Sequence, residues 1–140
     1  MSFNVLIVDD SGAIRSVIKK ILTISGFNVD KCYEAGNGRE ALAVLSREWV
    51  DIILSDIHMP EMDGFELLRE LNRHDVYAAI PVIMISTEGN ERRINAAYVL
   101  GAKGFIKKPF LPEELKRTLY EVMGVGDEGE YPADTDECDF

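Results

Sequence analysis

The chain has 140 residues and a formal net charge of −10, from 25 acidic and 15 basic side chains. This charge argues against nonspecific binding to nucleic acid, because the phosphates would repel the protein. No apolar stretch approaches the ~20 residues that a membrane helix needs, and the N-terminus has no basic, leader-like region. We therefore expect one domain, located in the cytoplasm, with an ordinary hydrophobic core.

The negative charge is concentrated in residues 124–140. This segment contains seven acids and no Lys or Arg, so residues 1–123 carry the remaining −3 of the total −10. A segment of this composition cannot bury enough apolar surface to fold. We therefore expect a folded domain over residues 1–123 and a disordered acidic tail over residues 124–140. Cys32 and Cys138 have no metal-binding or redox spacing and are expected to be incidental thiols.

Five short apolar runs alternate with five helical patterns along the chain. The runs have the length and composition of parallel strands buried on both faces, and the segments between them repeat apolar residues at helical spacing. The predicted strands are residues 3–8, 28–33, 50–55, 82–86 and 104–106. The predicted helices are residues 12–25, 38–48, 65–72, 90–100 and 112–123. Their short connections imply an α/β fold with helices on both faces of a parallel sheet.

The composition of individual elements adds detail to this fold. The second strand is the most polar and is expected at an edge of the sheet, whereas the third is expected near its centre. Trp49 is expected to pack at the end of the second helix. The first and fourth helices each have an apolar face that is expected to be buried: Ile14, Val17, Ile18, Ile21 and Leu22 in the first, and Ile94, Ala97 and Tyr98 in the fourth.

Polar side chains follow four of the predicted strands. They are Asp9 and Asp10, then Asp56, then Ser86 and Thr87, then Lys108. Because the carboxyl ends of parallel strands meet at one edge of a sheet, these groups are expected to converge there. A cluster of carboxylates repels itself unless it binds a cation, and oxygen ligands suit Mg²⁺. A lysine beside them provides a positive charge for phosphoryl oxygens.

Each of these residues also has a simpler interpretation when it is considered alone. Asp9 and Asp10 are equally well explained as acids that stabilise a helix N-terminus. Asp56 fits a turn, Ser86 or Thr87 fits a helix cap, and Lys108 fits a solvated surface charge. The common position at strand ends favours the functional interpretation for the set as a whole.

Four short motifs follow one another along residues 3–123. They are Val8-Asp9-Asp10-Ser11, the run Asp56-Ile57-His58-Met59-Pro60-Glu61-Met62-Asp63-Gly64, Ile85-Ser86, and Lys108-Pro109-Phe110. In this order the motifs resemble the receiver domain of two-component response regulators, in particular the stand-alone chemotaxis type. The resemblance implies a single doubly wound, flavodoxin-like domain with a parallel five-stranded sheet of order 2-1-3-4-5.

The same resemblance implies a role for each matching residue. Asp56 matches the phospho-acceptor, and Lys108 and Ser86 match the residues that contact the phosphoryl group. Asp9, Asp10, Asp56 and the backbone carbonyl of His58 match the Mg²⁺ ligands.

Four further expectations come from the resemblance. Ser86 and Phe105 match the switch pair, and because Phe105 has no hydroxyl, only its burial reports activation. His58 and Glu88 are expected to tune the phosphoryl lifetime. The Lys108–Pro109 bond is expected to be cis, which is uncommon in general.

The implied function is phosphorelay signal transduction. A sensor histidine kinase or a small phosphodonor phosphorylates Asp56, and this event switches a protein-binding surface built from helix 90–100, strand 104–106 and helix 112–123. The protein is expected to be a regulator rather than an enzyme, apart from catalysing its own phosphorylation and dephosphorylation. We expect a monomer or a weak phosphorylation-dependent dimer, without direct contact to nucleic acid.

Three alternatives remain at this stage. The first is the receiver fragment of a larger transcriptional regulator. The second is a Mg²⁺-dependent phosphatase with an aspartyl nucleophile, and the third is an adaptor that has lost phosphorylation. The phosphatases resemble D-x-D, whereas His58 stands in place of the second acid here. Leu111 is a departure of another kind, because it stands where a polar cap of the last helix is expected.

Overall fold

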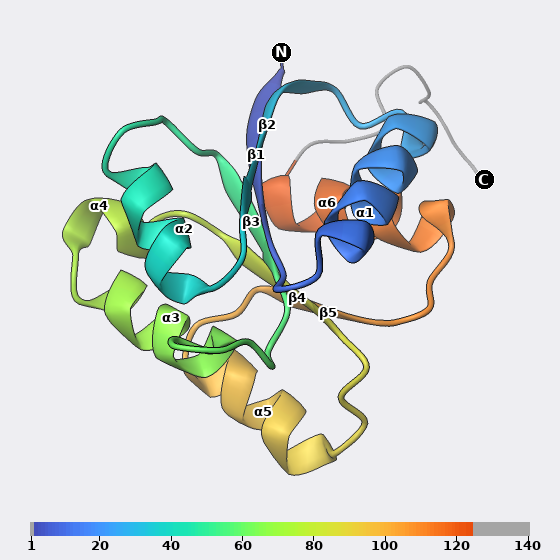
Figure 1. Cartoon of the computed structure of the whole chain (residues 1–140). Helices are drawn as coiled ribbons and strands as arrows, with labels where there is room; N and C mark the ends of the chain where they lie inside the picture. The colour runs from blue at the N-terminus through green and yellow to red at the C-terminus, as the bar shows by residue number, and fades with distance from the viewer. Residues whose placement is uncertain (1, 125–140) are drawn as a thin grey trace.

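The computed structural model describes residues 2–124 as a parallel sheet between two layers of helices (Figure 1). The strands are β1 (Phe3–Val8), β2 (Val29–Ala35), β3 (Ile52–Ser55), β4 (Val82–Ser86) and β5 (Gly104–Lys107). The helices are α1 (Gly12–Ser25), α2 (Gly38–Leu45), α3 (Gly64–Asn72), α4 (Asp75–Ala78), α5 (Glu91–Val99) and α6 (Pro112–Met123). The strand order β2-β1-β3-β4-β5 confirms the predicted fold class, with β2 at an edge and β3 at the centre.

Two hydrophobic clusters hold the layers together, one on each face of the sheet. Along β1, Leu6 and Val8 belong to the cluster beneath α2, α3 and α5, whereas Val5 and Ile7 belong to the cluster beneath α1 and α6. Figure 1 shows these two groups of helices on opposite sides of the strands. Because side chains alternate between the faces of a strand, a strand covered on both sides is apolar along most of its length. All residues of β3 and β4 are accordingly buried.

Local polar contacts fix where the helices begin. Ser11 caps α1 through its hydroxyl, which accepts the Ile14 N–H at 3.2 Å. Asp63 and Glu66 form a reciprocal capping box at α3. At α6, Leu111 provides no polar side-chain acceptor for the first turn, although its N–H donates to Glu114 Oε1 at 3.2 Å. The structure therefore confirms the missing cap at the last helix.

Two sequence expectations about packing are wrong. Trp49 is 70% exposed, because its indole N–H donates to Asp51 Oδ1 at 2.9 Å and holds the ring at the surface. Val17 and Tyr98 are also exposed, since each lies at the margin of its helix's apolar face and lines an open groove. The four-residue helix α4 was not predicted.

Some expectations concern residues outside the described part of the chain. The acidic tail, apart from Gly124, and Cys138 lie outside residues 2–124, and Cys32 is a free thiol. Among the helices of the described part, none is long and apolar enough to cross a membrane.

Candidate phosphorylation site

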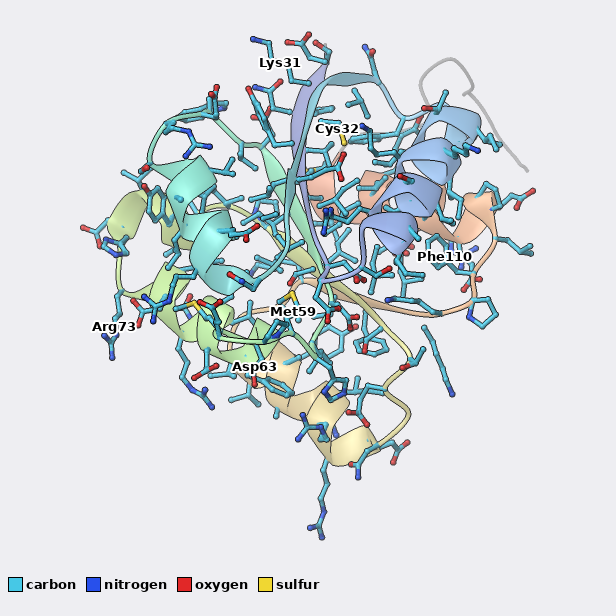
Figure 2. The ribbon with its side chains drawn as sticks, in the orientation of Figure 1. Lys31, Cys32, Met59, Asp63, Arg73 and Phe110 are labelled. Atoms are coloured by element: carbon cyan, nitrogen blue, oxygen red, sulfur yellow. The ribbon has the colours of Figure 1, made fainter. Side chains whose placement is uncertain are left out.

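The predicted site residues lie at the carboxyl ends of the strands. Asp9, Asp56 and Lys108 directly follow β1, β3 and β5, and Ser86 is the last residue of β4. Backbone hydrogen bonds continue the sheet past these ends, from Asp56 N–H to the Val8 carbonyl and from Lys108 N–H to the Ser86 carbonyl, both 2.9 Å. The side chains of the site are therefore anchored on rigid strand ends rather than on free loops. Figure 2 shows Met59 and Asp63 near this end of the molecule and Lys31 at the opposite end.

Lys108 joins the carboxylates of Asp9 and Asp56. Its Nζ donates to Asp9 Oδ2 at 2.9 Å and to Asp56 Oδ2 at 3.1 Å. The second oxygen of each carboxylate accepts a backbone N–H, from Ser11 to Asp9 at 2.9 Å and from Ile57 to Asp56 at 2.6 Å. Asp9 is 2% exposed. Each carboxylate is thus fixed at both oxygens, which orients it toward the same cation.

The charge of Lys108 is maintained by these neighbours. Burial is the largest single influence on its pKa and lowers it, but the hydrogen bonds to Asp9 and Asp56 and the charges of both carboxylates together outweigh burial. The pKa of Lys108 is therefore raised above its ordinary value, and its ammonium stays charged at neutral pH.

The third carboxylate does not join this cluster. Asp10 is exposed, and its side chain forms no hydrogen bond or ion pair with residues 2–124. Within the same residues, no three carboxylate, imidazole or thiol groups lie close enough to ligate one metal ion. The structure therefore brings Asp9, Asp56 and Lys108 together as expected and leaves Asp10 apart. The donors at this edge are hard carboxylate oxygens, and two of them already converge on the Lys108 ammonium. Such oxygen donors fit Mg²⁺.

Ser86 and Phe105 occupy neighbouring strands. Ser86 is fully buried, and its Oγ accepts the Glu88 N–H at 3.2 Å. Phe105 is partly buried, packs against the cluster beneath α5, and pairs in register with Met84 of β4. The two residues thus lie on adjacent strands, and Ser86 is also linked to Lys108, whose backbone N–H donates to the Ser86 carbonyl at 2.9 Å.

His58 and Glu88 meet directly, although 30 residues separate them. His58 Nε2 lies 3.2 Å from Glu88 Oε1, and Arg93 Nε donates to the same oxygen at 2.8 Å. The Asn90 N–H donates to Glu88 Oε2 at 3.0 Å. That backbone hydrogen bond, more than those from Arg93 and His58, holds the pKa of Glu88 below its ordinary value against the opposing effect of burial.

Gly64 closes the loop after β3 against the site. Its N–H donates to the Ile57 carbonyl at 2.8 Å. A Cβ at this position would collide with the Asp56 carbonyl oxygen and lie 2.8 Å from the Ile57 Cα. Glycine is therefore required here so that α3 can begin directly behind Asp56. The Lys108–Pro109 bond is cis, as expected.

Sequence reasoning missed two arginines beside the site. The Arg15 guanidinium donates to the Asp9 carbonyl at 2.6 Å, and the Arg93 guanidinium lies 4.9 Å from the centre of the Phe65 ring. Arg15 and Arg93 are basic residues in the first turn of a helix that follows a strand end, where the helix dipole does not favour them. A basic residue at such an unfavourable position is therefore a sequence signal that its side chain has a contact near the site.

The comparisons with known proteins identify the family. A family model described as "Response regulator receiver domain" matches residues 5–120. The chain belongs to this family and is a receiver domain of CheY type, a class that works in phosphoryl-accepting signal transduction. Receiver domains act together with histidine kinases and downstream target proteins.

Individual relatives agree with this assignment. The chain is 39% identical over 122 residues to the chemotaxis protein CheY homolog of Campylobacter jejuni, covering 86% of this chain and 92% of that protein. It is 40% identical to the probable transcriptional regulator ycf29 of Porphyra purpurea, covering 88% of this chain and 57% of that protein. The solved structure of chemotaxis response regulator CheY4 of Vibrio cholerae matches with a TM-score of 0.75 and 37% identity, covering 87% of this chain and 99% of that one.

Proposed function

We propose that Asp56 accepts a phosphoryl group in a Mg²⁺-dependent reaction and that phosphorylation switches a protein-binding surface of this chain. The observation that carries the proposal is the convergence of Asp9, Asp56 and Lys108 at one sheet edge, at 2.9 and 3.1 Å from the shared ammonium. Two anchored carboxylates and a retained positive charge are what a reaction between a carboxylate and a phosphate needs.

The reaction is an in-line displacement at phosphorus. A carboxylate oxygen of Asp56 forms the new P–O bond while the bond from phosphorus to the donor breaks. The donor is a phosphohistidine of a sensor kinase or a small acyl phosphate, and its leaving group keeps the electron pair of the broken bond. Lys108, already beside Asp56, pairs with the oxygens of the transferred group and offsets their charge.

Mg²⁺ would be held by the carboxylates of Asp9, Asp10 and Asp56 and by the backbone carbonyl of His58. When bound, it neutralises negative charge on the transferring group. The free, exposed carboxylate of Asp10 supports this assignment, because no interaction within the described residues would have to break before it binds an ion.

Phosphorylation is proposed to act through Ser86 and Phe105. The Ser86 hydroxyl turns to the phosphoryl oxygens, and Phe105 becomes more buried in the space that is left. The movement changes the surface formed by α5, β5 and α6. An open groove on this surface supports its role in binding a partner; its lining includes Tyr98, Lys103, Phe105 and Val122. The target is a protein rather than nucleic acid, and the chain works as a monomer or a weak phosphorylation-dependent dimer.

His58 and Glu88 are proposed to tune how long the phosphoryl group survives. Their contact bridges the loops that follow β3 and β4. Asp56 begins the first of these loops, and Ser86 directly precedes the second. The only catalysis in this proposal is the chain's own phosphorylation and dephosphorylation. The cytoplasm is the proposed location, because histidine-kinase phosphodonors act there.

The proposal treats residues 1–123 as the receiver domain and residues 124–140 as an acidic tail. A stand-alone chemotaxis or phosphorelay regulator is supported by the 92% coverage of the Campylobacter relative. A second candidate, the receiver part of a transcriptional regulator, is supported by the Porphyra relative, of which the match covers only 57%.

The test is covalent labelling followed by intact-mass spectrometry. Incubation with acetyl phosphate and Mg²⁺ should add ~80 Da, one phosphoryl group, to the wild type and to Asp75→Asn, but not to Asp56→Asn. Asp75 is a suitable control because it is an exposed carboxylate at the start of α4, away from the strand ends. Equal labelling of Asp56→Asn would overturn the acceptor, and labelling undiminished by EDTA would overturn the role of the metal.

A further inference from the structure

A set of contacts around Glu88 joins the rim of the site to the first turn of α5. Glu88 Oε1 contacts both His58 Nε2 (3.2 Å) and Arg93 Nε (2.8 Å), and the Arg93 guanidinium lies over the Phe65 ring of α3. The Glu88 side chain is only 11% exposed. A single carboxylate therefore ties together the loop after β3, the loop after β4, and α5, while Phe65 fixes the arginine on its other side.

Glu88 also reaches the site itself through its backbone. Its N–H donates to Ser86 Oγ at 3.2 Å. If the Ser86 hydroxyl turns toward a phosphoryl group, this N–H loses its acceptor and the loop that carries Glu88 is released on one side. One residue therefore touches the switch serine through its backbone and α5 through its carboxylate.

The position of Arg93 is not explained by helix stability. Arg93 lies in the first turn of α5, where the partial positive charge of the helix N-terminus disfavours a cation. The cap of this turn is Asn90, whose side chain accepts the N–H groups of Arg92 and Arg93. What distinguishes Arg93 from Arg92 is the contact of its side chain with Glu88 and Phe65.

We infer that Arg93 is a positioning residue that acts through Glu88 to set the lifetime of the phosphoryl group on Asp56. The inference rests on the proposed function. Arg93 holds the Glu88 carboxylate against His58, so that these two side chains bridge the ends of β3 and β4. The bridge limits the approach of water, whose oxygen attacks phosphorus while the bond to the Asp56 oxygen breaks and inorganic phosphate leaves.

The experiment follows loss of the label from the full chain. Wild type, Arg93→Ala and the control Arg92→Ala are phosphorylated with acetyl phosphate and Mg²⁺, the donor is removed, and the decay of the added mass is timed. Arg92 is a matched control because it is exposed and its side chain forms no hydrogen bond or ion pair within residues 2–124. The Arg93 side chain is 45% exposed, and Glu88 keeps its contacts with His58 and the Asn90 N–H when Arg93 is removed. Decay should therefore be only about two- to five-fold faster in Arg93→Ala, and unchanged in Arg92→Ala.

A double-mutant cycle separates positioning from general stability. If Arg93 acts through Glu88, adding Arg93→Ala to Glu88→Ala should leave the decay rate of Glu88→Ala unchanged. Wild-type decay in Arg93→Ala, even with a lower Tm, or additive effects of the two substitutions would overturn the inference. Absence of any label on the wild type would instead overturn the proposed function, and this inference with it.

Discussion

Lys108 shows how one side chain stabilises a site whose other members repel each other. Two carboxylates with limited access to water lie within hydrogen-bonding distance of its ammonium. Without a nearby cation, both would have to remain ionised at close range or one would have to take up a proton. In the absence of a metal, Lys108 is therefore part of the fold as well as part of the proposed chemistry.

We predict that Lys108→Ala lowers the free energy of unfolding by about 1–3 kcal/mol without Mg²⁺, because it leaves charged, partly buried acceptors unpaired. Added Mg²⁺ should restore more stability to this variant than to the wild type, since the carboxylates then gain a cation. The measurement is urea unfolding with and without Mg²⁺. Lys107→Ala is the control, because Lys107 is exposed and outside the cluster; equal stability of the two variants would contradict the prediction.

At the scale of elements, α3 and α6 differ in how they begin. Asp63 accepts the Glu66 N–H at 2.9 Å, whereas Leu111 offers no acceptor and is 64% exposed. Because little apolar surface of Leu111 is buried, a polar side chain there should gain a cap at little cost in packing.

We therefore predict that Leu111→Ser raises the free energy of unfolding by about 1 kcal/mol, and that Asp63→Ala lowers it by a similar amount. Chemical denaturation of the two variants beside the wild type checks both signs. A Leu111→Ser protein less stable than the wild type would show that Leu111 contributes more through packing than its exposure indicates.

The elements that were predicted correctly are those with a strong repeating pattern. The bounds of β1, α1 and α6 match the sequence expectation, because their apolar residues follow one period over the whole element. The helix α4 has only four residues, too few to show a period, and it was missed. The burial of Trp49 was predicted wrongly because the hydrophobic pattern does not show that the Asp51 carboxylate binds the indole N–H and holds the ring at the surface.

For the whole molecule, the acidic cluster could be predicted because it depends on topology alone. Once the strands are parallel, Asp9, Asp56 and Lys108 must meet at one edge. The contact of Arg93 with Glu88 and Phe65 depends on side-chain conformations in α5, α3 and the loop after β4, and no sequence spacing encodes it. The separate position of Asp10 has the same origin, since the strand end places its backbone but not its carboxylate.

Within the part of the chain that the structure describes, both core clusters are made from residues 3–123. We therefore predict that a chain ending at Gly124 unfolds within ~0.5 kcal/mol of the full chain and is phosphorylated at the same rate, although its net charge changes from −10 to −3 when the seven acids are removed. Urea unfolding and the rate of mass gain check the two parts. A large loss of either in the shorter chain would show that the tail belongs to the functional domain.

The central claim, that Asp56 is the acceptor, is tested most directly by locating the modified residue. Sodium borohydride reduces an acyl phosphate to the alcohol, so a phosphorylated aspartate becomes homoserine, which tandem mass spectrometry locates in a peptide. After treatment with acetyl phosphate and Mg²⁺, we predict homoserine at position 56 and at no other aspartate. Homoserine at Asp9 or Asp10, or an unmodified residue 56 in protein that carries the added mass, would contradict this account.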